Sequence, residues 1–181
     1  VSVRSQLRLK ITETGSIRLD VTTENFPHSD HIEMAGEQMA CVVRWALDED
    51  AALSVERSLV FPILRTLPNT TRASLMQRMG VDIPSLISVD ELCIRARKTT
   101  EVEINGMFRA VEMLCVGEEN LGKEHNADLT PVISLERKIF PSVDKPMVCE
   151  LYTLVNVSKD PVMVYIPTFA LRITSPEKNE R

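Results

Sequence analysis

The sequence predicts an all-β protein: an antiparallel β-sandwich of about ten strands with little helix. Apolar and polar residues alternate with a period of two in one segment after another, which is typical of strands with one buried face. Turn residues separate these segments, and no pattern of a crossover helix lies between them. Strands joined without crossovers form antiparallel sheets, and two such sheets bury their apolar faces against each other.

Three predicted hairpins show the alternation most clearly. Their strands and turns are 7–11 and 17–21 around Thr14-Gly15, 39–47 and 53–61 around Asp48-Glu49-Asp50, and 101–104 and 107–110 around Asn105-Gly106. The last is the strongest local signal, because Asn-Gly readily takes the positive φ angles of a type I′ turn.

The second hairpin supplies the predicted core. Each of its strands places its large apolar residues in one phase: Met39, Cys41, Val43, Trp45 and Leu47 in the first, and Leu53, Val55, Leu59 and Phe61 in the second. An exposed tryptophan can stack on a sugar ring, but the phase of Trp45 favours a core position.

The rest of the chain is predicted as follows. Strands are expected at 132–140, 147–157 and 162–166, between segments that contain proline. Residues 69–79 suit either a helix or a strand, and we favour a strand; residues 118–127 are expected to form an exposed loop. We expect one domain over residues 1–174, followed by a frayed tail or the start of a linker at 175–181.

Composition excludes several functional classes. The 181 residues carry 26 acidic and 21 basic side chains, a formal charge of −5, without the basic cluster that a nucleic-acid partner needs. The sequence does not begin with Met and has no apolar run of signal-peptide length, so we expect a processed or excised chain. The composition is not that of a membrane-spanning protein, and we expect no membrane insertion. The four cysteines lack metal-ligand spacing, and we expect neither a metal nor a cofactor. Cys41 and Cys149 are expected to be buried free thiols.

The most unusual polar cluster lies at residues 30–37, just before the apolar strand at 39–47. It contains the candidate contact residues Asp30, His31, Glu33 and Glu37. In an extended segment His31 and Glu33 point to the same side, where they would contact a metal, a sugar hydroxyl or a neighbouring catalytic domain. A structural loop whose polar groups bond backbone amides is the competing interpretation, and it leads on sequence alone.

Catalysis by the chain itself finds little support. Glu33 and Glu37 are conceivable as a glycosidase pair, but acidic residues this close together are common. His28 and His125 have no nucleophile motif near them, so no catalytic residue is assigned.

Three segments in this order resemble a known family. They are Asp30-His31-Ile32-Glu33-Met34-Ala35-Gly36-Glu37, the run from Phe61 to Met76 that begins Phe-Pro-Ile-Leu-Arg-Thr-Leu-Pro, and Phe140-Pro141-Ser142-Val143-Asp144-Lys145-Pro146 leading into Glu150-Leu151-Tyr152. Over residues 16–167 the chain is similar to the N-terminal β-sandwich region of bacterial six-hairpin, (α/α)6-barrel glycoside hydrolases.

The resemblance implies a supersandwich-like accessory domain that does no catalysis itself. It would pack on a catalytic (α/α)6 barrel of the same polypeptide, with residues 30–37 best placed to touch the barrel or an oligo- or polysaccharide. It also implies an extracytoplasmic location, in the periplasm or at the cell surface. The alternative is an autonomous carbohydrate-binding or adhesion module, but the chain has only 4% aromatic residues for stacking on sugars.

Overall fold

A computed structural model describes residues 9–21, 27–60, 77–79, 82–89, 94, 96–117 and 129–166, with the backbone alone at 60 and 77–79. These residues are mostly strand. The strands are β1 (Leu9–Ile11), β2 (Ile17–Asp20), β3 (His28–Ala35), β4 (Ala40–Leu47), β5 (Leu53–Val60), β6 (Gln77–Met79), β7 (Ser88–Val89), β8 (Ala96–Ile104), β9 (Phe108–Val116), β10 (Thr130–Pro141), β11 (Val148–Asn156) and β12 (Val164–Tyr165). A short 3-10 helix, η3, spans Ile83–Leu86.

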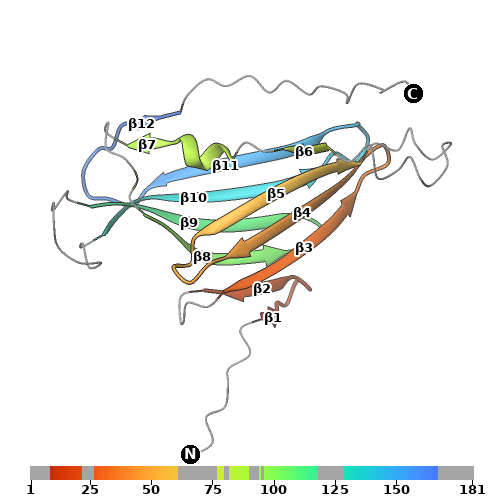
Figure 1. Ribbon diagram of the computed structural model, residues 1–181, viewed down its shortest axis with the longest axis horizontal. Helices are drawn as coiled ribbons and strands as arrows, with labels where there is room; N and C mark the ends of the chain where they lie inside the picture. Colours follow the sequence, from red (N-terminus) through yellow and green to blue (C-terminus); the bar gives the residue numbers. More distant parts are fainter. Residues whose placement is uncertain are drawn as a thin grey trace, which may run out of the picture.

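The strands form two stacked antiparallel sheets and a small third one (Figure 1). The larger sheet has the order β1-β2-β8-β9-β10-β11, and the four-stranded sheet has the order β3-β4-β5-β6. Strands β7 and β12 pair beside η3 at one end of the molecule. The predicted all-β antiparallel fold is therefore confirmed.

The main core lies between the two large sheets. It joins residues of β4 and β5, among them Val43, Trp45 and Leu59, to residues of the larger sheet such as Phe108 and Ile139. The phase predicted for the second hairpin is thus confirmed at its described positions. Trp45 is 3% exposed, and its ring lies 6.2 Å from that of Phe108, centroid to centroid.

A second apolar cluster fills the other end of the sandwich. It packs Leu114, Ile133 and Leu135 of the larger sheet against Ile87 and Val89. At this end the larger sheet extends beyond the four-stranded sheet that faces it, and the small sheet of β7 and β12 covers the cluster instead.

The predicted hairpins form, with one correction at the Asn-Gly turn. Gly15 and Gly106 both have positive φ angles, of 80° and 62°. Ile104 pairs with Phe108, so three residues join β8 to β9, and Asn105 is not among the residues with positive φ. The turn is therefore not type I′: Gly106 alone supplies the left-handed conformation that lets the strands reverse.

Strand β11 reverses the expected orientation of one cysteine. Cys41 is buried and free as predicted, whereas Cys149 is free but only half-buried. Register places Glu150 and Tyr152 in the inward phase of β11, so Cys149 lies on the outer face with Leu151. The prediction assumed that the apolar residues of this strand face inward, but Glu150 and Tyr152 make its inward side partly polar.

Other predictions fall partly or wholly outside the described residues. Within the ambiguous segment 69–79, residues 77–79 form β6, as the preferred strand interpretation has it. The predicted loop at 118–127, Phe61, Cys93, His125 and the tail at 175–181 lie outside the described residues.

Candidate functional site

Most of the acidic cluster, residues 30–35, belongs to the edge strand β3 rather than to a loop. β3 runs from His28 to Ala35 and pairs only with β4 in the described part of the chain. The alternation of side chains along β3 is that of a strand with one buried face. Met34 is buried and Ile32 packs against the core, while Glu33 between them is exposed. His28 begins this strand, and its ring lies 5.1 Å from that of Trp45, centroid to centroid.

Cross-strand register arranges the outer face of the four-stranded sheet in rows. His31 of β3 lies opposite Arg44 of β4, which lies opposite Glu56 of β5. In the next row Ser29, Ala46 and Ser54 lie opposite one another. A row of small side chains thus runs beside a row of long ones, and the surface is lowered over the small row.

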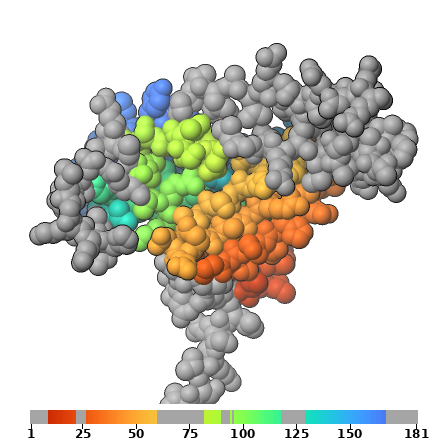
Figure 2. Space-filling model, viewed as in Figure 1, coloured from red at the N-terminus to blue at the C-terminus, as the bar shows by residue number. Residues whose placement is uncertain are grey.

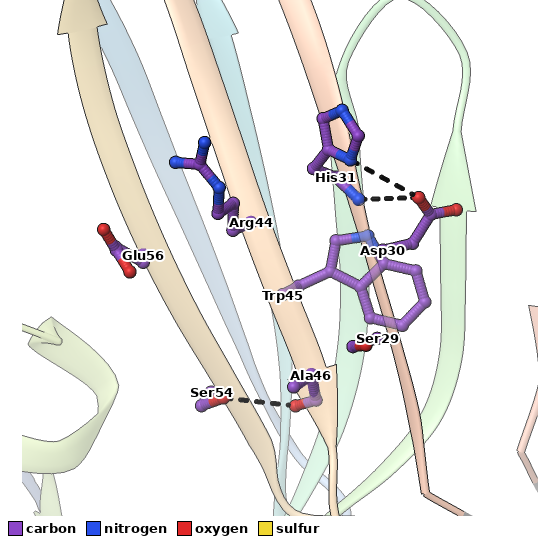
Figure 3. Close-up of a pocket in the computed structure, with 8 residues that line it drawn as sticks. All are labelled: Ser29, Asp30, His31, Arg44, Trp45, Ala46, Ser54 and Glu56. Carbon is purple, nitrogen blue, oxygen red and sulfur yellow. Dashed lines mark hydrogen bonds and ion pairs between the residues drawn. The ribbon is translucent and has the colours of Figure 1, made fainter.

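A hollow of about 440 Å³ occupies this place, and we call it the outer-face hollow (Figure 3). It is lined by Ser29, Asp30, His31, Arg44, Trp45, Ala46, Ser54 and Glu56. Figure 2 shows the molecule from the side on which the orange atoms of β3, β4 and β5 lie next to one another. The hollow brings the predicted residues Asp30 and His31 together with Arg44, Ser54 and Glu56.

The polar groups of the hollow have few contacts with one another. The Asp30 Oδ1 accepts a hydrogen bond of 2.7 Å from the backbone N–H of His31, and lies 3.8 Å from the Nδ1 of that residue. The Ser54 hydroxyl donates to the carbonyl of Ala46 over 3.4 Å. Arg44 is exposed and has no ion-pair partner in the part of the chain that the structure describes.

The other two predicted residues lie apart from the hollow. Glu33 is exposed on the same side of β3 as His31, as predicted, opposite Val42 of β4. Glu37 lies in the turn after β3, where its backbone N–H donates to the carbonyl of Val143 over 2.8 Å. Among the described residues no group of His, Cys, Asp and Glu has the arrangement of a metal site.

Glu37 therefore marks a junction between the ends of the two large sheets. The Gln38 side-chain amide donates to the carbonyl of Asp144 over 2.7 Å. At Gly36 a Cβ atom would lie 1.9 Å from the backbone oxygen of Ser142, so only glycine fits. This part of the cluster thus has a structural role.

A buried charge network, which sequence reasoning missed, lies between the sheets. It consists of Arg57, Asp82, Arg97, Glu112, Arg137, Glu150 and Tyr152. Arg137 and Glu112 are wholly buried, 3.4 Å apart, and Asp82 contacts Arg137 over 2.9 Å. Arg97 contacts both acids and donates to the carbonyl of Leu53 on the opposite sheet.

The other half of the network lies on β11 and β5. The Arg57 Nε is 2.7 Å from Glu150 Oε1, and the Tyr152 hydroxyl donates to the same carboxylate. The Tyr152 ring also lies beneath the Arg137 guanidinium. Glu150 is thus an inward residue of β11 that pairs with Arg57.

Burial shifts the titration of several groups in and near this network. Desolvation raises the pKa of the Glu112 carboxyl, against the attraction of Arg137 and Arg97. Burial is the largest cause of the raised pKa of the Tyr152 phenol, and its hydrogen bond to Glu150 is the second largest. The Cys41 thiol beside them has its pKa raised to about 11, mainly by burial.

The outward-facing acids of the larger sheet form a separate ionic cluster. Arg109 contacts Glu101, Glu103 and Glu136, and Arg18 pairs with Glu103 over 3.1 Å. Hydrogen bonding from Arg109 lowers the pKa of the Glu136 carboxyl. Two arginines thus pair with all three acids.

The residues that complete the hollow had a signal in the sequence. Arg44, Ser54 and Glu56 occupy the polar phase of the predicted hairpin at 39–61, and its turn fixes which of them lie opposite each other. Pairing the facing ends of the predicted strands 39–47 and 53–61, Leu47 with Leu53, predicts that Arg44 faces Glu56. The position of β3 beside β4 has no such local signal.

Comparison with known proteins gives no relative: no protein-family model, no curated protein and no solved structure matches this chain. Among the described residues, no helix is long and apolar enough to cross a membrane.

Proposed function

We propose that this chain is a non-catalytic accessory β-sandwich domain of a bacterial carbohydrate-degrading glycoside hydrolase. It packs on a catalytic (α/α)6 barrel of the same polypeptide, in the periplasm or at the cell surface. Support comes from the order of the three family-like segments, the all-β architecture, and the exposed polar face of β3, β4 and β5. That face, with His31 and Glu33, is the proposed contact with the rest of the enzyme.

One observation carries the non-catalytic part of the proposal. The wholly buried carboxylate among the described residues, on Glu112, is paired with Arg137, and that of Glu150, 12% exposed, is paired with Arg57. A glycosidase needs two carboxyl groups across an accessible cleft, one of them kept protonated. Glu33 is exposed on the sheet face and does not line the outer-face hollow.

An autonomous carbohydrate-binding module is the second candidate, and the outer-face hollow is the observation in its favour. Tight sugar binding usually requires an exposed aromatic face. Trp45 lines the hollow but is 3% exposed, because its ring belongs to the core. Of the tryptophan, tyrosines and phenylalanines whose side chains the structure describes, Tyr165 is the exposed one, and it lies on β12.

Substitutions in the full-length enzyme test the proposal. We expect Glu33→Ala and His31→Ala to reduce kcat/KM about three- to tenfold, the effect of one or two lost interface contacts. The melting temperature of the 181-residue chain carrying the same changes stays within about 2 °C of the parent, since both side chains are exposed.

Glu49→Ala, in the exposed turn after β4, is the matched control and leaves both quantities unchanged. Unchanged turnover together with a lowered melting temperature would show that the cluster is purely structural. Fractionation of the native host, with the full-length protein detected in the cytoplasm alone, would contradict the proposed location.

A further inference from the structure

We propose that Asn105 is a site of spontaneous deamidation, and that its conversion to isoaspartate destabilises the hairpin of β8 and β9. The inference goes beyond the proposed function and concerns a different part of the molecule. It is carried by the Asn105-Gly106 sequence, by the exposure of both residues, and by the hydrogen bonds that the turn makes and leaves unmade.

The reaction needs only these two residues and water. The backbone nitrogen of Gly106 loses its proton to base and attacks the Cγ atom of Asn105, the Cγ–Nδ2 bond breaks, and ammonia leaves. The resulting five-membered succinimide is then opened by a water molecule. Breaking the bond from nitrogen to Cγ yields aspartate, whereas breaking the bond from nitrogen to the main-chain carbonyl carbon yields isoaspartate. One amide and one water thus give a carboxylic acid and ammonia, and nothing is oxidised or reduced.

The attacking nitrogen is accessible. Asn105 and Gly106 are both exposed in the turn between the two strands. Glycine has no Cβ atom to shield its nitrogen, and even an added Cβ at Gly106 would meet no other atom within 4 Å. Base and water can therefore reach both the nitrogen that attacks and the ring that forms.

The hydrogen bonds of the turn leave the reacting groups free. The Asn105 backbone N–H donates to the carbonyl of Met107 over 3.1 Å. Within the described part of the chain, neither the Gly106 N–H nor the Asn105 side-chain amide has a hydrogen-bond partner. No hydrogen bond of either reacting group has to break before the ring closes.

Asn156 provides the opposite case in the same molecule. Its Nδ2 donates to the Asp160 carbonyl over 2.9 Å, and its Oδ1 accepts from the Ser158 backbone N–H and hydroxyl over 2.9 and 2.7 Å. The nitrogen that would attack, on the β-branched Val157, donates to the Val132 carbonyl over 3.0 Å. Each bond that must first break slows a reaction about three- to tenfold, so this asparagine is protected several times over.

The isoaspartate product changes the length of the turn. Three residues join the paired Ile104 and Phe108, and isoaspartate adds one atom to the backbone between them. Phe108 is wholly buried, with its ring 6.2 Å from that of Trp45. A longer turn therefore disturbs a strand end that the main core holds in place. The aspartate product keeps the original backbone, and both products add one negative charge to the formal −5 of the chain.

Incubation of the folded 181-residue chain tests the site. Ion-exchange chromatography separates the more negative products, and peptide mapping with electron-transfer dissociation distinguishes aspartate from isoaspartate. We expect both at Asn105, at a rate within about tenfold of that in a synthetic peptide of residues 101–110, since no hydrogen bond protects the turn. The rate rises from neutral to mildly alkaline pH because the attacking nitrogen must lose its proton. Asn156 stays intact over the same period.

Two variants separate the chemistry from its consequence. Asn105→Gln keeps an amide but would have to close a six-membered ring, so we expect no product at this position. The purified isoaspartate form should melt about 3 °C below the parent because of the longer backbone. Freshly purified Asn105→Asp, which has the charge without the extra atom, should melt within about 1 °C of the parent.

Three results would overturn the proposal. The first is a rate in the folded chain more than about a hundredfold below that of the peptide, since it would show that the fold protects Asn105. The second is deamidation of Asn156 as fast as that of Asn105, because the hydrogen bonds would then not decide the site. The third is an isoaspartate form that melts like the parent, which would show that the turn absorbs the extra atom.

Discussion

Arg57 and Glu150 form an ion pair that joins the two large sheets, with the Arg57 Nε 2.7 Å from the Glu150 Oε1 and the side chains 1% and 12% exposed. Arg57 lies on β5 of the four-stranded sheet and Glu150 on the outermost described strand of the larger one. Because a charge buried there needs a partner of opposite sign, the pair restricts how the two sheets stack.

The first prediction concerns this pair. Glu150→Leu should lower the free energy of unfolding by about 3–5 kcal/mol, since it removes the carboxylate that faces the buried Arg57 guanidinium and also removes the acceptor of the Tyr152 hydroxyl. Arg57→Met with Glu150→Leu should recover much of that loss, because both charges are then gone. Urea unfolding of the two single variants and the double variant measures the coupling.

Glu49→Leu is the control, since Glu49 is exposed in a turn and its replacement should change stability by less than about 0.5 kcal/mol. Additive effects of the two single changes, each below about 1 kcal/mol, would show that the pair does not couple the sheets.

The second prediction concerns the centre of the core. Val43 is wholly buried between the sheets, so Val43→Asp places an unpaired carboxylate in an apolar environment and should prevent folding. Expression, solubility and a thermal melt monitored by circular dichroism measure the outcome. Ser54→Asp, on the exposed face of the neighbouring strand, should fold normally; a soluble Val43→Asp variant that melts cooperatively would contradict the assigned orientation of β4.

Sequence alternation predicted this core because the strands around Val43 bury one uniformly apolar side. It failed for β11, where Cys149 was expected to be buried but is half-buried, and where Glu150 faces inward. The inward orientation of Glu150 depends on Arg57, which is remote in the sequence, and no local pattern reports such a partner. The same holds for Glu112 and Arg137, which pair across neighbouring strands.

Prediction of the candidate site was limited in the same way. The composition of residues 30–37 singled out Asp30 and His31, which line the outer-face hollow. The hollow itself exists because three strands bring Ser29, Ala46 and Ser54 into one row, and that requires the register of β3 against β4. Glu37 shares the composition of the cluster but lies in the turn beyond the strand.

The third prediction is a loss of stability at alkaline pH that depends on Cys41. Its pKa is about 11 in the fold against an ordinary value of 9.0, so folding favours the neutral thiol. Its contribution is complete below about pH 9 and is lost as the pH rises through about 11, because the unfolded thiol ionises first. The loss between about pH 8 and pH 11 should be about 2 kcal/mol.

Urea unfolding of the parent and of Cys41→Ala across this pH range measures the difference. The variant should lose about 2 kcal/mol less than the parent, since Tyr152 and the other alkaline groups titrate in both proteins. Equal pH dependence in the two proteins would show that Cys41 is not held neutral by the fold. A thiol reagent applied to the native protein should modify half-buried Cys149 faster than Cys41.

The last prediction is that the 181-residue chain alone hydrolyses no glycoside. Hydrolysis needs a protonated acid and an ionised carboxylate held about 5 to 10 Å apart across the sugar. Glu112 is the described carboxyl group whose pKa burial raises, but it is wholly buried between Arg97 and Arg137, where no substrate reaches it. The purified chain should therefore leave a panel of plant and host glycans intact, as measured by released reducing ends. Turnover that Glu33→Ala or Glu37→Ala abolishes would show that the chain is an enzyme in its own right, with a cleft that includes the edge of β3.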